Sequence, residues 1–398
     1  MDALSELLSL PDSEKAARGL VHTPAEIAQQ PDTWLSTFDL FRKRRNEIAE
    51  FIGAAEITAN LKSKPTVFLI GAGTSDYIGQ SVSSLLRKAW ACEVLAVPST
   101  DLLTQMDDLI VPGAQYLWIS FSRSGDSPEG VAVLEQARKR HPKIRHLVIS
   151  CNRNGRMIRD SVGDPQVLAI CLDDAVNDRG LAMTSSFSNM VVFGQCLGHC
   201  LAADGAARYE EILHRLADAG RGFLPRAANC ASSLAHSGYT KACFVGSGPL
   251  RAVAKESALK VMELTAGKTL TMSESALGLR HGPMAALDQD ALFVCFLSSD
   301  ARTQQYERDL LDEIRAKDLV KCRVVVGEAG STANGSAAEH RLDLGMSGAI
   351  DDDYRPAIDV MFGQLLGVFL SLQWNLQPDR PSPNGAISRV VQNVSIHL

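Results

Sequence analysis

The sequence lacks an excess of positive charge. Its 398 residues include 40 Lys and Arg against 46 Asp and Glu, which gives a formal net charge of −6. Proteins that bind nucleic acids or anionic membranes present basic surfaces, so neither is expected as a main partner. A small anionic ligand is not excluded, because a local site can be positive on an acidic protein.

The sequence also lacks a disulfide framework. Its nine cysteines are odd in number, irregularly spaced and mostly set in apolar runs, which predicts reduced core thiols and a cytoplasmic location. Cys196, His199 and Cys200 are candidate metal ligands, but no second ligand pair accompanies them. Their segment, MVVFGQCLGHCLAA, favours a buried helix, so no metal is expected.

No targeting segment or membrane span is predicted. The first residues, MDALSELLSLPDSEKAARG, have no basic start followed by an apolar core, as a signal peptide requires. The stretch from Phe187 to Ala203 is apolar enough to raise a membrane question. Ser188, Asn189, Gln195 and His199 interrupt it, so a core helix is the better interpretation.

The rest of the sequence has ordinary globular composition and contains one pattern twice. Hydrophobic residues make up 45% and charged residues 22%, and the length predicts two or three domains. TVFLIGAGTSDYIGQSVSSLLRK and ACFVGSGPLRAVAKESALKVMEL both show an apolar strand, a Gly-x-Gly turn and a helical pattern. Predicted strand ends recur at a shift of 175 to 177 residues, in the pairs Gly71 and Gly246, Ser122 and Ser298, and Ser150 and Gly327. Three matches in register indicate an internal duplication.

Each half alternates apolar strands with helical segments, which predicts an α/β fold. We expect two tandem doubly wound parallel-sheet domains with three α/β/α layers. The predicted boundaries are a helical lead-in at 1–45, a first domain at 46–210, a second domain at 211–378 and an extended tail at 379–398. Ligands of such sheets bind beyond the carboxyl ends of the strands.

The first glycine turn, GAGTSD at 71–76, invites a dinucleotide interpretation. That fingerprint requires a third glycine where this chain has Asp76, and a carboxylate there would face a pyrophosphate. A nicotinamide dehydrogenase is therefore disfavoured. Gly73 still lets backbone N–H groups approach a ligand, and Thr74 and Ser75 add hydroxyl donors at a helix start.

The second loop, SRSGDS at 122–127, combines donors that suit a phosphate monoester. Ser122, Ser124 and Ser127 offer hydroxyls, Arg123 offers a full charge, and the following helix offers unpaired N–H groups. One capping serine in a solvated loop is the alternative, but three serines exceed what a cap needs. The second copy, SSDARTQQ, lacks the glycine and carries Asp300, so only the first half is expected to hold phosphate.

The second half places charged groups on one helical face. Glu256, Lys260 and Glu263 stand at i, i+4 and i+7 in KESALKVMEL. Spacing alone favours a solvated ion-paired face, while a carboxylate beside the lysine is the alternative, a general base. His281 precedes Gly-Pro in LRHGP, a turn that would hold an imidazole at a loop tip for acid–base work.

Together these segments resemble the sugar isomerase (SIS) family of tandem phosphosugar-binding domains, over most of the chain from about residue 21. The matching motifs are GAGTS at 71–75, SRSGDS at 122–127, ESALKVME at 256–263, LRHGP at 279–283 and EIAQQPDTW at 26–34. More narrowly, NDRGLAMTSSFSNM at 177–190 and the tail PSPNGAISRVVQNVSIHL resemble the galactosamine-6-phosphate deaminase/isomerase branch, also described as tagatose-6-phosphate ketose/aldose isomerases.

The resemblance implies a role for each matching residue. Substrate binding is implied for Gly73, Thr74, Ser75, Ser122, Arg123, Ser124, Ser127, Thr184, Ser185 and Arg389. Glu263 matches the base that moves a proton between C1 and C2, Glu256 and Lys260 match its helical companions, and His281 matches the histidine of ring opening. A homodimer or dimer of dimers with sites shared between subunits is implied.

Two departures from the related glucosamine-6-phosphate synthase concern charge. Arg123 stands where that enzyme often has glutamine, and Ile387 stands where its tail has a lysine. Arg389 is the candidate replacement for that lysine. The synthase also carries a glutaminase with a terminal cysteine, whereas the first cysteine here is Cys92, so ammonia release is the more natural direction.

The implied activity converts galactosamine 6-phosphate to tagatose 6-phosphate and ammonia, without metal or organic cofactor. Plain ketose/aldose isomerisation uses the same proton transfer and stays open. A non-catalytic phosphosugar sensor is the alternative from another class. Glu263 with His281, and a lead-in too short for a helix-turn-helix module, favour the enzyme.

Overall fold

The computed structural model describes residues 1–57, 64–328, 338–346, 348, 350–391 and 394–397. Two compact units divide the chain, and each gathers segments that are distant in sequence. The first-sheet unit consists of Thr33–Asn177, Ser185–Glu211 and Ser388–Leu398. The second-sheet unit consists of Met1–Asp32, Asp178–Thr184 and Ile212–Ile387.

The first-sheet unit is built on five parallel strands in the order β2-β1-β3-β4-β5. Because every residue of β3 and all but the first of β1 are buried, this sheet is covered on both faces, as parallel sheets are. The strands are β1 Thr66–Gly71, β2 Val94–Pro98, β3 Tyr116–Ser122, β4 Arg145–Ser150 and β5 Val167–Cys171.

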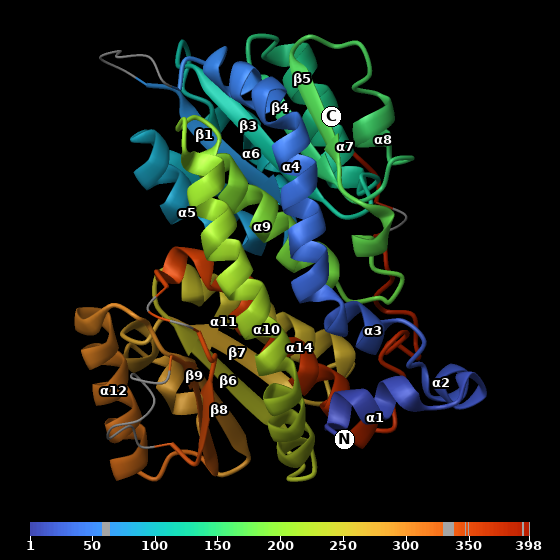
Figure 1. Ribbon diagram of the computed structural model, residues 1–398, viewed down its shortest axis with the longest axis vertical. Coiled ribbons are helices and arrows are strands. Elements are labelled where there is room, and N and C mark those ends of the chain that lie inside the picture. The colour runs from blue at the N-terminus through green and yellow to red at the C-terminus, as the bar shows by residue number, and fades with distance from the viewer. Residues whose placement is uncertain (58–63, 329–337, 347, 349, 392–393, 398) are drawn as a thin grey trace. The chain divides into compact units, whose positions relative to one another are not determined.

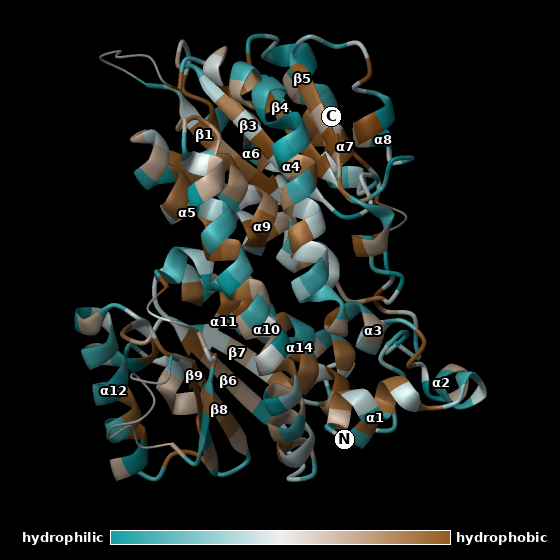
Figure 2. Ribbon diagram, in the orientation of Figure 1, coloured by the Kyte–Doolittle hydropathy of each residue, from teal (hydrophilic) through white to brown (hydrophobic). Residues whose placement is uncertain are grey.

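Helices of the first-sheet unit follow or flank these strands (Figure 1). They are α5 Thr74–Trp90, α6 Ser99–Leu109, α7 Pro128–Arg140, α8 Arg156–Arg159, η1 Asp174–Val176 and α9 Ser185–His199. The core-helix interpretation of the apolar stretch from Phe187 agrees with α9, which is buried from Ser185 to Leu197 and coloured brown in Figure 2. It packs on α5, and a Cβ on its Gly194 would lie 3.0 Å from Val82.

The second-sheet unit repeats the same strand order. Its sheet runs β10-β9-β8-β6-β7, all parallel, which is the first sheet's order when each strand is replaced by its counterpart. The strands are β6 Lys241–Gly246, β7 Leu270–Glu274, β8 Ala291–Phe296, β9 Cys322–Gly327 and β10 His340–Asp343. β1 ends at Gly71 and β6 at Gly246, so the first strands are 175 residues apart.

The predicted fold class, two tandem doubly wound parallel-sheet domains, is confirmed. The matched strand order supports the internal duplication, which stays a prediction, as do the linear domain boundaries. The helices of the second-sheet unit are α1 Ala3–Ser9, α2 Asp12–Arg18, α3 Thr23–Ala28, α11 Pro249–Leu264, η2 Gly278–Arg280, η3 Pro283–Ala286, α12 Ala301–Ala316, η4 Asp352–Tyr354 and α14 Pro356–Gln373. Two long helices, α4 Gln30–Gly53 and α10 Gly205–Ala235, run from one unit into the other.

The close contact of α11 with α14 organises the second-sheet unit. A Cβ on Gly363 of α14 would lie 2.3 Å from Oγ of Ser257, and one on Gly367 would lie 3.1 Å from the carbonyl oxygen of Lys260. Glycine at both positions therefore lets the two helices approach closely. By length and composition α14 is apolar enough to cross a membrane, but it is 89% buried inside the fold, as the central helix of a core is.

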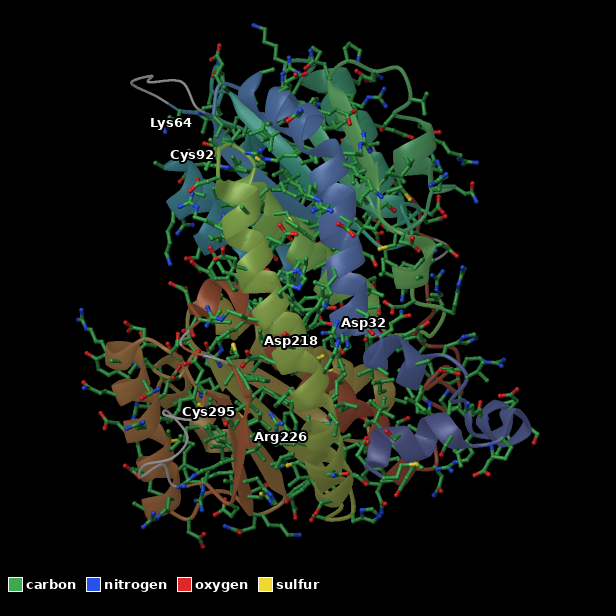
Figure 3. All side chains as sticks on the ribbon, viewed as in Figure 1. Asp32, Lys64, Cys92, Asp218, Arg226 and Cys295 are labelled. Carbon is green, nitrogen blue, oxygen red and sulfur yellow. The ribbon has the colours of Figure 1, made fainter. Side chains whose placement is uncertain are left out.

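Polar contacts between distant segments complete the second-sheet unit. Arg221 of α10 donates to Asp32 at 2.6 Å and to Asp218 at 2.7 Å, and Figure 3 labels both carboxylates. The carboxylate of Asp379 accepts hydrogen bonds from the backbone N–H groups of residues 21 to 23. It thereby satisfies donors at the start of α3 that have no helical partner.

Candidate active site

The loop between β3 and α7 presents three hydroxyl groups. Ser122 Oγ accepts from the N–H of Gly125 at 3.0 Å, Ser124 Oγ from Asp126 at 3.1 Å, and Ser127 Oγ from Gly130 at 3.3 Å. Each hydroxyl is thus oriented by an accepted bond, and none donates to another of the residues that the structure describes. Because a hydroxyl also carries one O–H donor, this serine loop, Ser122–Ser127, retains three donors for a ligand.

The loop after β4 holds the serine loop in shape. Asn152 Nδ2 donates to the carbonyl oxygen of Ser124 at 2.8 Å and to Asp126 Oδ2 at 3.3 Å. Asp126 also accepts from the N–H of Arg156 at 2.9 Å, so these donors offset its carboxylate charge. Gly125 has φ +63°, and a Cβ there would meet Ser150 Oγ at 3.1 Å, which accounts for glycine at this turn.

The start of α5 adds a further hydroxyl to this unit. Gly73 is the N-cap residue, and Thr74 and Ser75 are buried in the first turn. Ser75 Oγ makes no hydrogen bond within the described part of the chain, so it stays available to a ligand. The first-turn N–H groups and the helix dipole favour an anion at such a position.

Two arginines that are distant in sequence meet in the first-sheet unit. The guanidinium of Arg123, which is buried, donates to the backbone carbonyl of Arg389 in the tail. The guanidinium of Arg389 in turn donates to Asn177 Oδ1 at 2.7 Å. Arg123 therefore holds the tail beside the serine loop, and Asn177 fixes the side chain of Arg389. Ile387, at the position expected for a lysine, is exposed.

The charged face of α11 is buried, which corrects the expectation of a solvated face. Lys260 and Glu256 have side-chain exposures of 1% and 0%, and Nζ lies 3.3 Å from Glu256 Oε1. The same Nζ lies 2.6 Å from Oε2 of Glu263, whose side chain is 24% exposed. Burying charges costs several kcal/mol per ion, so a contribution to stability does not by itself account for this triad. Among these three groups only the Glu263 carboxylate reaches solvent appreciably.

Thr184 and Ser185, predicted to contact substrate, are both fully buried. Thr184 donates its hydroxyl to Asp178 at 2.9 Å and accepts at its carbonyl from Gln364 of α14 at 3.4 Å. Ser185 begins α9, and its carbonyl accepts from Asn189. The Thr184 hydroxyl is thus engaged within the fold, and substrate contact by either residue stays a prediction.

Glu26, in the lead-in motif, supports the segment that contains Asp178. Its Oε1 accepts from the N–H of Arg179 at 2.5 Å and of Gly180 at 3.3 Å. Burial, together with the neighbouring carboxylates of Asp178 and Asp379, raises the pKa of Glu26 to about 7. This carboxyl therefore changes its charge in the neutral pH range.

His281 lies exposed in the loop between η2 and η3, followed by Gly282 at φ +124°. The predicted turn is therefore present. No hydrogen bond or ion pair joins the imidazole to α11 within the part of the chain that the structure describes. Its predicted role in ring opening stays untested by this geometry.

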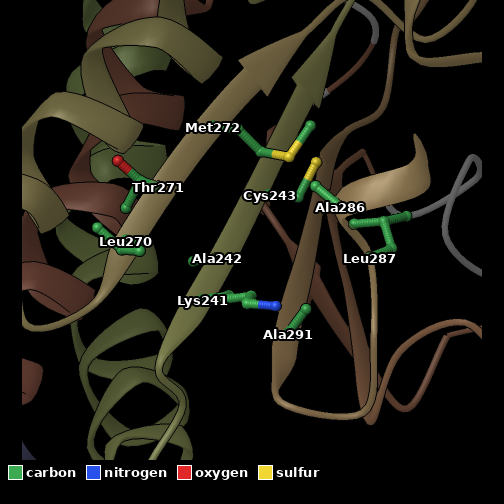
Figure 4. A pocket seen from close by; sticks show the side chains of 9 residues that line it. All are labelled: Lys241, Ala242, Cys243, Leu270, Thr271, Met272, Ala286, Leu287 and Ala291. Carbon is green, nitrogen blue, oxygen red and sulfur yellow. The ribbon is translucent and has the colours of Figure 1, made fainter. Parts of the chain in front are cut away.

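A separate cavity of about 240 Å³ opens at the amino ends of the second sheet's strands. Figure 4 shows Met272 and Cys243 turned toward this space, with Lys241 at its side. The Lys241 ammonium pairs with Asp288. Because substrates of such sheets bind at the carboxyl ends, this apolar cavity lies at the wrong end for the chemistry.

The candidate metal ligands Cys196, His199 and Cys200 lie at the end of α9 and directly after it, and both cysteines are buried. Burial raises the pKa of the Cys200 thiol to about 12, which disfavours the thiolate that a metal requires. His199 stacks on Tyr209 with ring centroids 5.1 Å apart. Among the described residues, no group of three or more His, Cys, Asp or Glu side chains is arranged to hold a metal ion.

Several supporting residues were not predicted from the sequence. They are Ser150, Asn152, Asn177 and Glu26. Asn152 stands in CNRNG directly after a predicted strand end, and that turn signal next to the serine loop could have identified it. Asn177 and Glu26 act through partners more than 150 residues away, which local patterns do not reveal.

The chain is similar in sequence to known proteins over most of its length. The family model described as SIS domain matches residues 60–199. D-galactosamine-6-phosphate deaminase AgaS of Escherichia coli is 35% identical over 387 residues, covering 94% of this chain and 95% of that protein. The protein of the same name from Shewanella sp. is 31% identical over 95% of this chain and 92% of its own length.

Solved structures of related proteins have the same fold as this chain. The crystal structure of tagatose-6-phosphate ketose/aldose isomerase from Escherichia coli has a TM-score of 0.83 and 31% identity, with 94% of this chain and 96% of that chain covered. The C-terminal domain of glucosamine-fructose-6-phosphate aminotransferase from Francisella tularensis, at 19% identity and a TM-score of 0.73, shares the fold. The chain therefore belongs to the AgaS family of SIS-domain proteins.

Proposed function

We propose that the protein is a D-galactosamine-6-phosphate deaminase that releases tagatose 6-phosphate and ammonia. The observation that supports this choice of substrate is the 35% identity to the Escherichia coli deaminase over 94% of the chain. The proposal is supported by groups suited to each part of the reaction: the serine loop with its hydroxyl donors in one unit, and a partly exposed carboxylate beside a buried lysine in the other.

The phosphate ester is assigned to the serine loop and Ser75. Three oriented hydroxyls, the N–H groups at the start of α7 and those at the start of α5 are donors of the kind that a phosphate dianion needs. Arg123 contributes positive charge and anchors the tail through the Arg389 carbonyl. This assignment explains why a chain of net charge −6 can still bind an anion.

Proton transfer is assigned to Glu263. In the open-chain aldehyde, Glu263 removes the proton from C2 as O1 gains a proton, which forms an enolamine. The same carboxyl then delivers its proton to C1, which leaves an iminium ion at C2, and loss of one N–H proton to solvent gives the imine and balances the proton gained by O1. Lys260 Nζ donates a hydrogen bond to this carboxylate at 2.6 Å and holds it in position. Positioned acid–base groups of this kind contribute roughly 10²–10⁴ in rate.

Hydrolysis completes the reaction. One water adds across the C2 imine, the C2–N bond breaks, and ammonia leaves as the ketone forms, so atoms balance as amino sugar plus water giving ketose plus ammonia. No step exchanges electrons with an external acceptor. The reaction therefore calls for positioned proton donors and acceptors, which side chains provide.

Ketose/aldose isomerisation without loss of nitrogen is the second candidate. It is favoured by the similarity to the structure titled tagatose-6-phosphate ketose/aldose isomerase. It uses the same proton transfer between C1 and C2, and differs only in the group at C2. The two activities are therefore distinguished by product and not by the residues involved.

The test is an assay that measures ammonia and ketose separately. The purified protein is incubated with galactosamine 6-phosphate, glucosamine 6-phosphate and tagatose 6-phosphate. Ammonia from galactosamine 6-phosphate is the expected result, and ketose–aldose conversion without ammonia would support the isomerase instead. Glu263→Gln should lose at least 10²-fold in kcat while it still binds phosphosugar; an active Glu263→Gln would contradict the assigned base.

We further propose that the enzyme is a homodimer in which His281 serves the substrate of the neighbouring subunit. Its exposure at a rigid turn supports this placement. Mixing subunits of Glu263→Gln with subunits of His281→Asn, each inactive alone, should then restore part of the activity. Absence of recovery in verified mixed dimers would show that each chain uses its own histidine.

A further inference from the structure

The second sheet has a loop at the same place as the serine loop. Thr66 of β1 pairs with Tyr116 of β3, and Lys241 of β6 pairs with Ala291 of β8, so both strand pairs share a shift of 175 residues. The loop from Leu297 to Asp300 therefore joins β8 to α12 as the serine loop joins β3 to α7. It is two residues shorter, because the helix N-caps are Asp300 and Ser127.

In this second loop the donors are already occupied by a carboxylate. Asp352 of η4 accepts from the hydroxyl of Ser298 at one oxygen. Its other oxygen accepts from the backbone N–H of Ser299 at 2.9 Å and from the Ser299 hydroxyl at 2.8 Å. Arg355 Nη1 donates to that same oxygen at 2.9 Å.

The cation beside Asp352 is held rigidly. The side chain of Arg355 is completely buried and forms two hydrogen bonds to Asp359, at 2.8 Å and 3.1 Å. It also donates to the carbonyl of Leu297, the first residue after β8. Its position is therefore fixed by groups other than Asp352, so the cation would stay in place if that carboxylate were removed.

A further carboxylate makes the loop unfavourable for a second anion. Glu307 of α12 accepts from the N–H of Ser298 at 2.7 Å. Burial raises its pKa to about 7, so it carries partial negative charge at neutral pH. Asp300 adds a further charge at the N-cap of α12. With Asp352 in place, an approaching phosphate meets several carboxylates and no unoccupied donor of this set.

The donors around Asp352 are those that a phosphate oxygen requires: two hydroxyls, one backbone N–H and one guanidinium. We propose that the Asp352 carboxylate is an internal substitute for a phosphate group, which closes a second anion site and reserves phosphate binding for the serine loop. Each chain then binds one phosphate ester. Removal of Asp352 opens a site for inorganic phosphate or a phosphate monoester beside Ser298, Ser299 and Arg355.

The test compares Asp352→Ala with the wild type and with Asp300→Ala. The control, Asp300→Ala, removes a carboxylate and a helix cap from the same loop. It leaves the hydrogen bonds between Asp352 and its donors intact. Thermal unfolding is followed while inorganic phosphate replaces chloride at constant ionic strength. Both variants should unfold at lower temperature than the wild type in chloride.

Phosphate should then change the Tm of the two variants by different amounts. At about tenfold above the dissociation constant, it should raise the Tm of Asp352→Ala by roughly 3 °C more than that of the wild type. Asp300→Ala should respond as the wild type does. Equal responses of all three proteins would overturn the proposal, because a purely structural carboxylate leaves no anion site behind.

Equilibrium dialysis with radiolabelled phosphate gives the stoichiometry. Asp352→Ala should bind one phosphate per chain more than the wild type, and no additional phosphate would refute the inference. If Asp352→Ala does not fold, Asp352→Ser, which keeps a short acceptor, takes its place. The comparison does not depend on the proposed deaminase activity, because failure of the serine loop to bind phosphate would lower all values equally and preserve the difference.

Discussion

Replacement of Lys260 by methionine tests whether the α11 triad is a buried charge cluster. Lys260 lies 3.3 Å from one carboxylate and 2.6 Å from another, and its side chain is 1% exposed. At an effective dielectric constant of about 20, the two attractions are worth roughly 5 and 6 kcal/mol before desolvation. Lys260→Met leaves the fully buried Glu256 without this cation, which typically costs about 3–5 kcal/mol.

A second substitution separates charge from packing. Lys260→Met/Glu256→Leu removes both members of the buried pair, and apolar replacements of similar volume are often neutral. The double variant should therefore regain most of the free energy of unfolding that the single variant loses. It should stay catalytically impaired, because Glu263 has lost the hydrogen-bond donor 2.6 Å away that holds its carboxylate in position.

The assay is urea unfolding of the three proteins, combined with ammonia release from galactosamine 6-phosphate. The reasoning predicts a large loss of stability in Lys260→Met, recovery in the double variant and low kcat in both. A single variant as stable as the wild type would refute the buried-charge argument. A double variant with wild-type kcat would refute the role of Lys260 in supporting Glu263.

Two further substitutions test the phosphate site and the pH response. Ser124→Ala removes one hydrogen bond to a charged ligand, worth about 1.5–3 kcal/mol, so KM for the phosphosugar should rise roughly 10- to 100-fold. The control Ser83→Ala removes a hydroxyl of α5 that donates to the carbonyl of Gln80, and it should leave KM unchanged. An unchanged KM in Ser124→Ala would exclude the Ser124 hydroxyl from the site. Glu26→Gln tests a carboxyl whose pKa is raised from 4.5 to about 7 in the folded state. Because the folded protein holds this proton more tightly, wild-type stability falls as pH rises from about 4.5 through 7, by up to about 3 kcal/mol for this group. Urea unfolding should show that the free energy of unfolding of Glu26→Gln, relative to that of the wild type, is higher at pH 8 than at pH 5. The same difference between the two proteins at both pH values would contradict the raised pKa.

Strand positions could be predicted because buried parallel strands are short apolar runs with clear ends. The predicted ends at Gly71, Ser122, Gly246 and Gly327 agree with β1, β3, β6 and β9. β8 ends at Phe296, two residues before the prediction, because Leu297 continues the apolar run without continuing the strand. The serine loop was found because its hydroxyls and glycine stand together in sequence.

The burial of the charged face of α11 could not be predicted from local sequence patterns. Charges at i, i+4 and i+7 define a face, but they do not say what covers that face. Here α11 packs closely on α14, whose Gly363 and Gly367 lie about a hundred residues further along the chain. Likewise, the carboxylate that occupies the second loop comes from Asp352, 54 residues beyond Ser298. Long-range partners of this kind follow from tertiary packing, which a single sequence does not specify.

The interleaving of segments in the two units bears on how the chain folds during synthesis. The first three helices belong with residues 212–387, and Asp379 caps α3 from almost the opposite end of the polypeptide. The first-sheet unit in turn includes the final residues, from Ser388 onward. Each unit therefore contains segments that lie before and after most of the other unit in the sequence, so a simple N-terminal-first order of folding, one unit after the other, does not complete either unit. The first three helices can pack into their unit only after residues 212–387 have been synthesised.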